Sequence, residues 1–259
     1  MINIARLAAA ARNFKNSEPF DHCVIEGFFE DDVAREIEKE CPGFEDGLWH
    51  VYDNSIEVKK TTNVWYNFGP KTYQALAYLS SPAFVNMISG YLNLPGLKAD
   101  VGLHGGGWHV HGSGGLLNPH LDYSIHPKLG LQRKLNLIVY LNSSWQDDWG
   151  GQLGLWEDSQ DSPGSLIKSV TPRFNTAILF DTTQKSWHGL VETVKTPPGQ
   201  IRRSLAVYYM VEPQIDADKR GKALYAPTKD QEDDDEVLDL IKKRADLESA
   251  HETYVRERK

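Results

Sequence analysis

The chain has 259 residues, of which 40% are hydrophobic and 25% charged, and its formal net charge is −8. This composition is ordinary for a globular protein with a buried core. The acidic balance, without a Lys/Arg stripe before the C-terminal tail, argues against a nucleic-acid partner. No apolar run approaches the ~20 residues of a membrane span. Because Cys23 and Cys41 are too few for a disulfide framework, we expect a cytoplasmic protein.

The first hundred residues are predicted to be mainly helical, with strands between the helices. Apolar side chains recur at helical spacing at the start of the chain, namely Ile4, Leu7, Ala8, Ala11 and Phe14. This segment lacks a basic region before its apolar run, so we interpret it as a packed helix and not as a signal peptide. The stretch "DHCVIEGFF" reads as a strand and "EDDVAREIEKEC" as a helix, and residues 71–92 predict two helices that meet at Ser81-Pro82.

From about residue 100 the sequence breaks into short strands separated by Gly, Pro, Asn and Asp. The predicted strands are "GWHVHG", "PHLDYS", "RKLNLIVYLN", "GQLGLWE", "NTAILF", "SWHGLVETV" and "IRRSLAVYYMVE". Strands at this spacing are typical of a sandwich or barrel. We therefore predict a mainly β fold with helical support (α+β), in which residues 1–215 form one domain with a barrel at about 100–212.

The tail, residues 216–259, is charged, and "DQEDDDEVLDLIKKR" is its best helical segment. Val237, Leu238, Ile241 and Ala245 can form one apolar stripe on such a helix. This stripe either packs on the domain or joins two copies of the chain as a homodimer.

A histidine and an aspartate stand two residues apart in "NPHLDYS". On a strand this spacing returns His120 and Asp122 to the same face. A later strand supplies His188 in "QKSWHGLVETV". Two histidines and one carboxylate that leave neighbouring coordination positions open are the ligand set of non-haem Fe(II) oxygenases.

A second set of polar residues is predicted to face the inside of the barrel. Alternation along "IRRSLAVYYM" places Arg202 and Ser204 on one face and Arg203 on the other. A buried guanidinium requires an anionic partner, and its forked shape suits a carboxylate. The strand "RKLNLIVYLN" likewise brings Asn136 and Tyr140 to one face.

Four motifs together resemble a known family, the 2-oxoglutarate- and Fe(II)-dependent oxygenases, in their prolyl-4-hydroxylase-like branch. The run "HGSGGLLNPHLD" fits the pattern Y-x-x-G-x-x-L-x-x-H-x-D, with His111, Gly114 and Leu117 in register. The other three are "RKLNLIVYLNSSW", "WGGQLGLW" and "WHGL", which contains His188. The resemblance covers about residues 105–212 and, more loosely, the N-terminal helices.

This resemblance implies a double-stranded β-helix, the jelly-roll or cupin-like barrel, with iron held by His120, Asp122 and His188. It implies that 2-oxoglutarate chelates the iron and places its far carboxylate on Arg202, helped by Tyr140 and Ser204. His111 stands where the branch usually has a tyrosine, and its imidazole can donate a hydrogen bond there. We add Asn136 to these predicted co-substrate residues.

The expected activity is that of a dioxygenase that uses O₂ to hydroxylate an unactivated C–H bond and releases succinate and CO₂. Ascorbate is a further candidate cofactor. The expected substrate is an amino acid, a prolyl peptide or another small metabolite. Residues 61–70 and 122–132 are candidate lid segments over it, although ordinary surface loops explain them equally well.

Two alternatives stay open at this point. His109 and His111, with His120 or His188, could form a three-histidine zinc site in a cupin-like protein. The fold could also serve as a non-catalytic module that binds 2-oxoglutarate.

Overall fold

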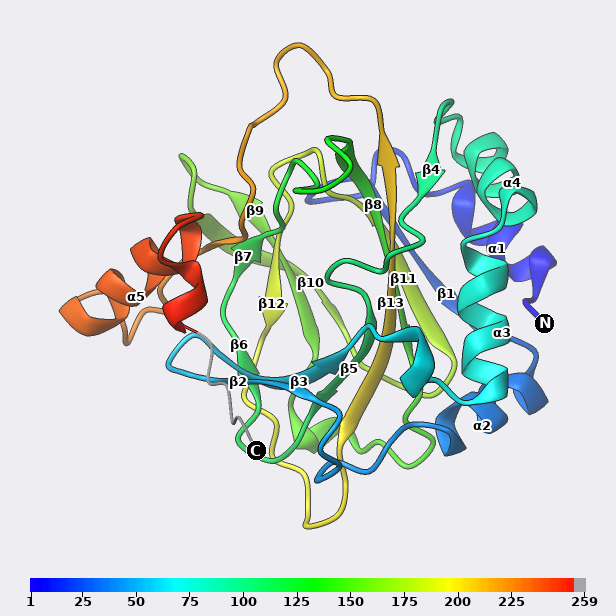
Figure 1. Ribbon diagram of the computed structural model, residues 1–259, viewed down its shortest axis with the longest axis horizontal. Helices are drawn as coiled ribbons and strands as arrows, with labels where there is room; N and C mark the ends of the chain where they lie inside the picture. The colour runs from blue at the N-terminus through cyan, green and yellow to red at the C-terminus, as the bar shows by residue number, and fades with distance from the viewer. Residues whose placement is uncertain (254–259) are drawn as a thin grey trace.

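Two antiparallel sheets face each other and form a barrel that is supported by helices on one side (Figure 1). The computed structural model describes residues 1–253. The larger, nine-stranded sheet comprises β1 (His22–Glu26), β2 (His50–Asp53), β3 (Glu57–Thr62), β4 (Lys98–Ala99), β5 (Gly107–His111), β6 (Leu116–Leu117), β8 (Gln132–Tyr140), β11 (Thr176–Asp181) and β13 (Arg202–Val211). The smaller, five-stranded sheet comprises β7 (His120–Leu121), β9 (Leu153–Asp158), β10 (Pro163–Val170), β12 (Trp187–Leu190) and β14 (Leu224–Tyr225).

The strand order places chain segments that are distant in sequence side by side. In the larger sheet the order is β1-β11-β8-β13-β5-β3-β2, with β4 paired to β13 and β6 paired to β3. In the smaller sheet the order is β10-β9-β12-β7-β14. The first, N-terminal strand therefore closes one edge of the larger sheet, and the C-terminal strand closes one edge of the smaller sheet.

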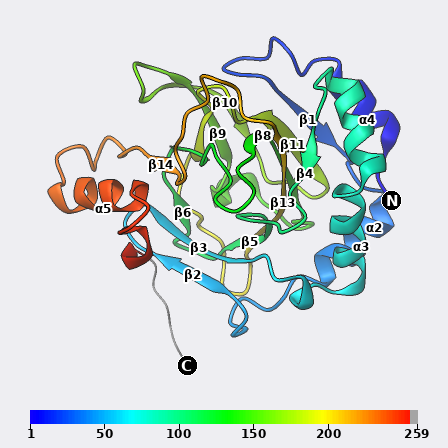
Figure 2. The same cartoon turned by 45° about the horizontal axis from the view of Figure 1, so that its top comes forward.

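Four helices near the N-terminus lie together on one side of the molecule, and the fifth lies on the opposite side (Figures 1 and 2). They are α1 (Ile4–Ala11), α2 (Asp31–Lys39), α3 (Pro70–Leu79), α4 (Pro82–Leu92) and α5 (Asp235–Ala245), and short 3-10 turns are found at η1 (Trp65–Asn67), η2 (Asp147–Trp149) and η3 (Ala250–Thr253). The predicted break at Ser81-Pro82 is confirmed. The Ser81 side chain accepts a hydrogen bond from the Phe84 amide, and Pro82 occupies the first turn of α4.

The largest hydrophobic core lies between the N-terminal helices and the larger sheet. Alternation along β8 and β13 sends Leu137 and Val207 into this core. Leu7 and Ala11 of the predicted N-terminal stripe are buried there, whereas Ile4 at the first turn of α1 is 47% exposed. The opposite face of the same strands is therefore left to line the interior of the barrel.

Six strands were not predicted from the sequence, namely β2, β3, β10 and the two-residue strands β4, β6 and β14. Two of the longer ones, β3 and β10, show why. The centre of β3 is Lys59-Lys60, so its sequence lacks the apolar alternation by which a half-buried strand is recognised. β10 begins at Pro163 on the edge of its sheet and leaves Leu166 and Ile167 exposed. Both strands are fixed by pairing with neighbours and not by a local hydrophobic pattern.

The C-terminal segment packs against the barrel. β14 pairs with β7, and α5 buries Val237 and Ile241 in a small core with Ile56 and Tyr225. Val237 and Ile241 of the predicted apolar stripe thus face their own domain. Among the five α-helices of residues 1–253, none has the length and apolar character needed to cross a bilayer.

Candidate active site

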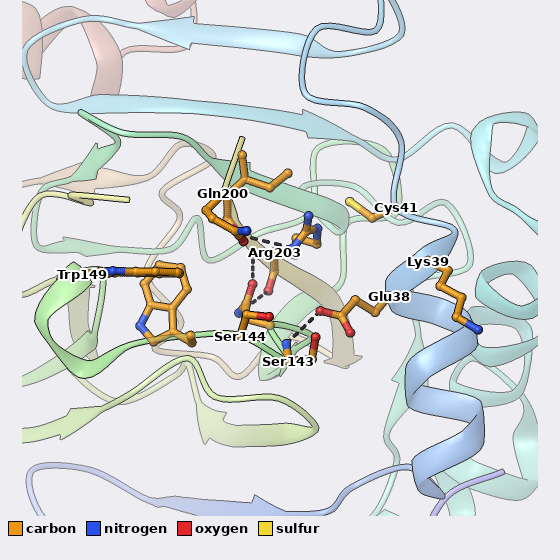
Figure 3. Close-up of a pocket in the computed structure, with 11 residues that line it drawn as sticks. Glu38, Lys39, Cys41, Ser143, Ser144, Trp149, Gln200 and Arg203 are labelled. Atoms are coloured by element: carbon orange, nitrogen blue, oxygen red, sulfur yellow. Dashed lines mark hydrogen bonds between the residues drawn. The ribbon is translucent and has the colours of Figure 1, made fainter. Parts of the chain in front are cut away.

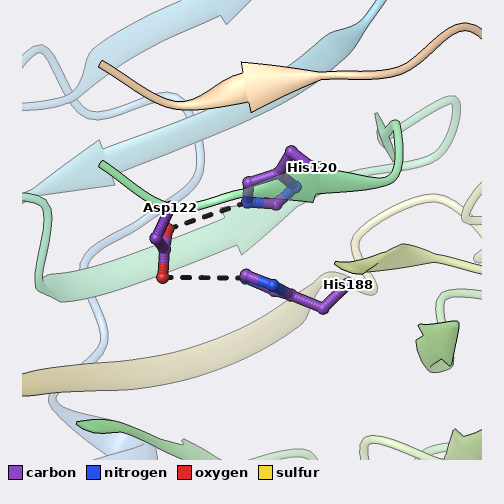
Figure 4. A group of neighbouring side chains, drawn as sticks. All are labelled: His120, Asp122 and His188. Carbon is purple, nitrogen blue, oxygen red and sulfur yellow. Dashed lines mark ion pairs between the residues drawn. The ribbon is translucent and has the colours of Figure 1, made fainter. Parts of the chain in front are cut away.

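His120, Asp122 and His188 meet inside the barrel (Figure 4). His120 lies on β7 and Asp122 directly follows that strand, while His188 on β12 is the cross-strand partner of His120. The Nε2 atom of His120 lies 3.9 Å from Asp122 Oδ1, and the Nε2 atom of His188 lies 3.8 Å from Asp122 Oδ2. One donor atom from each residue falls within 4.8 Å of the others. The three side chains can therefore contact one small cation, although His188 is far from His120 and Asp122 in the sequence.

Both imidazoles are oriented by the backbone. The Nδ1 atom of His120 is 3.0 Å from the Asn118 carbonyl oxygen, and that of His188 is 2.8 Å from the Ser186 carbonyl oxygen. A ring that donates a hydrogen bond from Nδ1 keeps a lone pair on Nε2, and here Nε2 faces the space between His120, Asp122 and His188. Burial lowers the pKa of His120 to about 3 and also lowers the pKa of His188. Both rings are thus neutral at physiological pH, as metal ligands must be.

Asp122 is held by a residue that the sequence analysis did not identify. The Nη1 atom of Arg133 lies 3.1 Å from Asp122 Oδ1, and Asn136 Nδ2 lies 3.4 Å from Asp122 Oδ2. Burial alone raises the pKa of Asp122, but the charge of Arg133 and the two neighbouring imidazoles outweigh it and lower that pKa below its usual range. The carboxylate therefore remains ionised and oriented inside the barrel.

Arg133 reaches this position because β8 contains a bulge. Tyr209 pairs with Leu135 and Met210 pairs with Arg133, so one step on β13 spans two residues on β8. The extra residue reverses the alternation, and Arg133 turns inward, where strict alternation from Asn136 predicts an outward side chain. Its guanidinium lies between the rings of Tyr123 and Tyr208, 3.5 Å from each ring centroid. No signal in the local sequence marks this bulge.

A buried guanidinium lies on the facing sheet. Arg202 is 3% exposed, and its Nε donates to the Gly151 carbonyl oxygen at 2.7 Å. Its central carbon lies 4.9 Å from the ring centroid of Tyr140. Among residues 1–253, no carboxylate lies within ion-pair distance of Arg202. An arginine this deeply buried fits an anionic ligand.

Further polar atoms on the barrel's inner surface are buried without a partner in the described part of the chain. They are the Tyr140 hydroxyl, both ring nitrogens of His111 and Oδ1 of Asn136. His111 is the cross-strand neighbour of Arg202, and Ser204 is the cross-strand neighbour of Tyr140. The Ser204 hydroxyl makes only a long contact, 3.5 Å, with the His109 carbonyl oxygen. Since buried polar groups need partners, the donors beside Arg202, which are the hydroxyls of Tyr140 and Ser204 and the imidazole of His111, fit a carboxylate ligand with several acceptor positions.

Arg203 occupies the other face of β13, as the alternation predicts. It lines a separate pocket of about 330 Å³ together with Glu38, Gln200 and Trp149 (Figure 3). Its backbone amide donates to Asn142 Oδ1 at 2.7 Å. The two adjacent arginines therefore serve different surfaces of the sheet.

The three-histidine alternative is not assembled in the described residues. Within them, the only group of three or more His, Cys, Asp or Glu side chains close enough to hold a metal is His120, Asp122 and His188. His109 instead directs Nε2 to the Gly105 carbonyl oxygen at 3.0 Å. The geometry favours the two-histidine, one-carboxylate set over a three-histidine zinc site.

A cavity of about 370 Å³ opens onto His120 and Asp122. Both predicted lid segments contribute to its wall, through Thr61 and Asn63 and through Tyr123 and Pro127. The C-terminal segment also contributes, and its Tyr225 ring stacks on His120 with centroids 5.0 Å apart. This contribution was not predicted from the sequence, although "ALYAP" is an apolar interruption of an otherwise charged tail.

Comparisons with known proteins agree with this geometry. Residues 106–210 match the model of the 2OG-Fe(II) oxygenase superfamily. The chain is 31% identical over 78 residues to the prolyl 3-hydroxylase OGFOD1 of Xenopus laevis, an alignment that covers 30% of this chain and only 15% of that relative. This chain therefore corresponds to a small part of the relative's length.

Two solved structures share the fold. A prolyl-4-hydroxylase from Pseudomonas putida superimposes with a TM-score of 0.58 at 17% identity, covering 80% of this chain and 100% of that structure. A prolyl hydroxylase from Trichoplax adhaerens, in complex with a peptide fragment of hypoxia inducible factor, gives a TM-score of 0.56 at 19% identity, covering 80% and 90% of the two chains. The predicted double-stranded β-helix with helical support is confirmed.

Proposed function

We propose that this protein is an Fe(II)- and 2-oxoglutarate-dependent dioxygenase that hydroxylates an unactivated C–H bond and releases succinate and CO₂. The observation that carries the proposal is a pair of complementary sites inside one barrel. A buried two-histidine, one-carboxylate group lies on one side, and a buried arginine with no carboxylate partner among residues 1–253 lies on the other. The superfamily match of residues 106–210 supports the same activity.

In this proposal His120, Asp122 and His188 hold the iron, and three neutral or singly charged donors leave its other positions open. Iron with 2-oxoglutarate and O₂ bound supplies the oxidising chemistry. The chain's own residues orient these groups and exclude water. Arg133 and Asn136 fix the Asp122 carboxylate, and the two backbone carbonyls fix the imidazoles.

The far carboxylate of 2-oxoglutarate is assigned to Arg202. The Tyr140 hydroxyl and the Ser204 hydroxyl would donate to the same carboxylate from the neighbouring strand positions. His111 would donate from β5, the role that the resemblance gives to a tyrosine. Asn136 lies closer to the metal group than to Arg202, because its amide contacts Asp122, so we place it between iron and co-substrate.

We propose that the substrate is a prolyl peptide, an amino acid or another small metabolite. The Xenopus relative is a prolyl 3-hydroxylase, and the Trichoplax structure holds a peptide. We propose a cytoplasmic location, which the free thiols of Cys23 and Cys41 support. Ascorbate stays a candidate reductant. A homodimer through α5 is not part of the proposal, since the helix buries its apolar stripe on its own domain.

Turnover of 2-oxoglutarate without substrate tests the activity. We expect the purified protein with Fe(II), 2-oxoglutarate and O₂ to release succinate slowly, and the His188→Ala variant to release none above background. A screen of amino acids and prolyl peptides should then find compounds that accelerate succinate release. Bound iron without succinate under every screened condition would instead indicate a non-catalytic 2-oxoglutarate-binding module.

A further inference from the structure

A short C-terminal segment, residues 220–226, runs alongside β7 and the residues that follow it, which include His120 and Asp122. The backbone carbonyl oxygen of Arg220 accepts hydrogen bonds from the amides of Ser124 and Ile125. The Arg220 side chain donates from Nη2 to the Asp122 carbonyl oxygen at 3.0 Å. Five residues later, Tyr225 pairs with His120 in the sheet and stacks on its ring. The segment is thus held at both ends, by Arg220 and by Tyr225, and the residues between them form part of the cavity wall.

A buried carboxylate fixes the same segment from behind. Glu57 on β3 is fully buried and accepts hydrogen bonds of 2.8 Å from the Tyr225 hydroxyl and from Nε of Arg244 on α5. Lys59 completes this group, with its Nζ 3.0 Å from Glu57. We call these four residues the Glu57 cluster. It joins β3, β14 and α5 into one rigid wall of the cavity.

The cavity wall is cationic, although the whole chain carries a formal charge of −8. Its charged lining residues are Lys59, Asp122, Arg133, Lys222 and Arg244. Asp122 is balanced by Arg133, and Glu57 behind the wall is shared by two of the other cations. A divalent metal and a dicarboxylate co-substrate, bound together, add no net charge. The space left for a substrate therefore keeps a positive excess.

Lys222 accounts for much of this excess. It lies between the two attachment points of the segment, is partly buried, and has no carboxylate within ion-pair distance among residues 1–253. Partial burial and the nearby charge of Arg244 lower the pKa of Lys222. No side chain of the described chain relieves that unfavourable environment, so a bound anion is the natural partner.

We propose that the substrate carries an oxyanion, a carboxylate or a phosphate, that Lys222 binds at the wall of the cavity while the reacting carbon lies over the metal group. This inference rests on the proposed function and specifies its substrate class. Lys222 and the Glu57 cluster lie outside residues 106–210, the part of the chain that matches the superfamily. The specificity is therefore supplied by segments of this chain that flank the catalytic core.

The test uses the full-length protein with Mn(II) in place of Fe(II), so that no turnover occurs, and with saturating 2-oxoglutarate, so that Arg202 is occupied. Acetate and methyl phosphate are titrated separately as probes of the two oxyanion types. Broadening of their methyl proton resonances by Mn(II) reports binding close to the metal. We expect saturable broadening for at least one probe, and the tighter probe distinguishes a carboxylate from a phosphate.

Two matched variants decide the role of the lysine. Lys222→Gln should weaken binding of the probe about tenfold, the effect of losing one charge-assisted hydrogen bond. Lys229→Gln removes the same charge from an exposed position three residues after the segment and should bind the probe as the wild-type protein does. Equal affinity in Lys222→Gln and wild type, or no broadening by either probe, would overturn the inference.

The same samples separate this inference from the proposed function. Binding of Mn(II) and of 2-oxoglutarate is measured before any probe is added. If both bind and the probes do not, only the anionic substrate class is wrong. If Mn(II) does not bind, the proposed function fails, and the inference that rests on it fails as well.

Discussion

Arg202 and Arg203 are adjacent in sequence, yet they occupy environments with opposite consequences. Arg202 is buried beside unpartnered polar atoms of Tyr140 and His111, whereas Arg203 lines the outer pocket with Glu38. Alternation along the strand was enough to predict this difference, because β13 is regular between Arg202 and Tyr209. The difference is also large enough to measure.

We expect Arg202→Ala to raise the dissociation constant for 2-oxoglutarate at least a hundredfold, with metal still bound. Losing one partner of a buried charge pair costs about 3–5 kcal/mol, or roughly two to four decades in affinity. Arg203→Ala is the control and should change the constant only a few-fold, since a half-exposed charge contributes about 1 kcal/mol or less. Isothermal titration in the presence of Mn(II) measures both. The reverse ranking would shift the register by one residue and remove Ser204 from the site.

A second prediction concerns the ion pair between Arg133 and Asp122. In the metal-free protein, Arg133→Met leaves the buried Asp122 carboxylate without its ion pair, which should lower the free energy of unfolding by about 3–5 kcal/mol. Added Mn(II) should stabilise this variant more than it stabilises the wild type, because the metal supplies the missing positive charge. Thermal unfolding with and without Mn(II) measures both effects, with Arg203→Met as control. Equal metal-induced shifts in Tm would contradict the role assigned to Arg133.

The elements that shape the site were predictable to different extents. Strands β8 and β13 have clear alternation, so Tyr140, Ser204 and Arg202 could be placed on the inner face. The bulge that turns Arg133 inward has no local signature, and it arises from pairing with β13. The strand β14 is two residues long and acquires its place only by pairing with β7. Such features depend on contacts between distant segments, which a single sequence does not display.

The Glu57 cluster supports a prediction about these elements. Burial alone raises the pKa of Glu57, but the charges of Lys59 and Arg244 and the hydrogen bonds from Arg244 and Tyr225 outweigh it and lower the pKa from 4.5 to about 2. The folded state then binds fewer protons than the unfolded chain. The resulting stability is present above about pH 4.5 and is lost as the pH falls towards 2.

Glu57→Gln should therefore destabilise the protein at pH 7 by about 3–5 kcal/mol, because two partly buried cations lose their counterion. The difference from wild type should shrink as the pH falls from 4.5 to 2, and urea unfolding at several pH values measures it. Glu45→Gln removes an exposed partner of Lys60 and should have little effect at any pH. A Glu57→Gln effect that stayed constant down to pH 2 would contradict the lowered pKa.

At the scale of the whole molecule, the order of helices followed by strands predicted a barrel supported by helices, and this is the fold observed. The sequence left the position of the C-terminal segment open, because a charged helix with one apolar stripe can pack on its own domain or on a second copy. The stripe of α5 is buried against Ile56 and Tyr225. The segment thereby becomes a wall of the cavity, which composition alone could not indicate.

The same burial predicts the assembly state. Because Val237 and Ile241 of its apolar stripe are buried in the domain, we expect no dimer through α5 and a monomer of 29.2 kDa. Size-exclusion chromatography with light scattering at micromolar concentration measures this mass. A stable dimer that dissociates on Ile241→Asp substitution would show that α5 leaves the domain to pair with a second copy.

The proposed activity depends on an iron ion that His120, Asp122 and His188 hold and that 2-oxoglutarate chelates. Its most direct test is the visible absorption spectrum of the protein mixed anaerobically with Fe(II) and 2-oxoglutarate. We predict the weak charge-transfer band of the chelate in the wild type and its loss in both His188→Ala and Asp122→Ala. A band of undiminished intensity in both variants would contradict the account, because the ligands would then lie elsewhere.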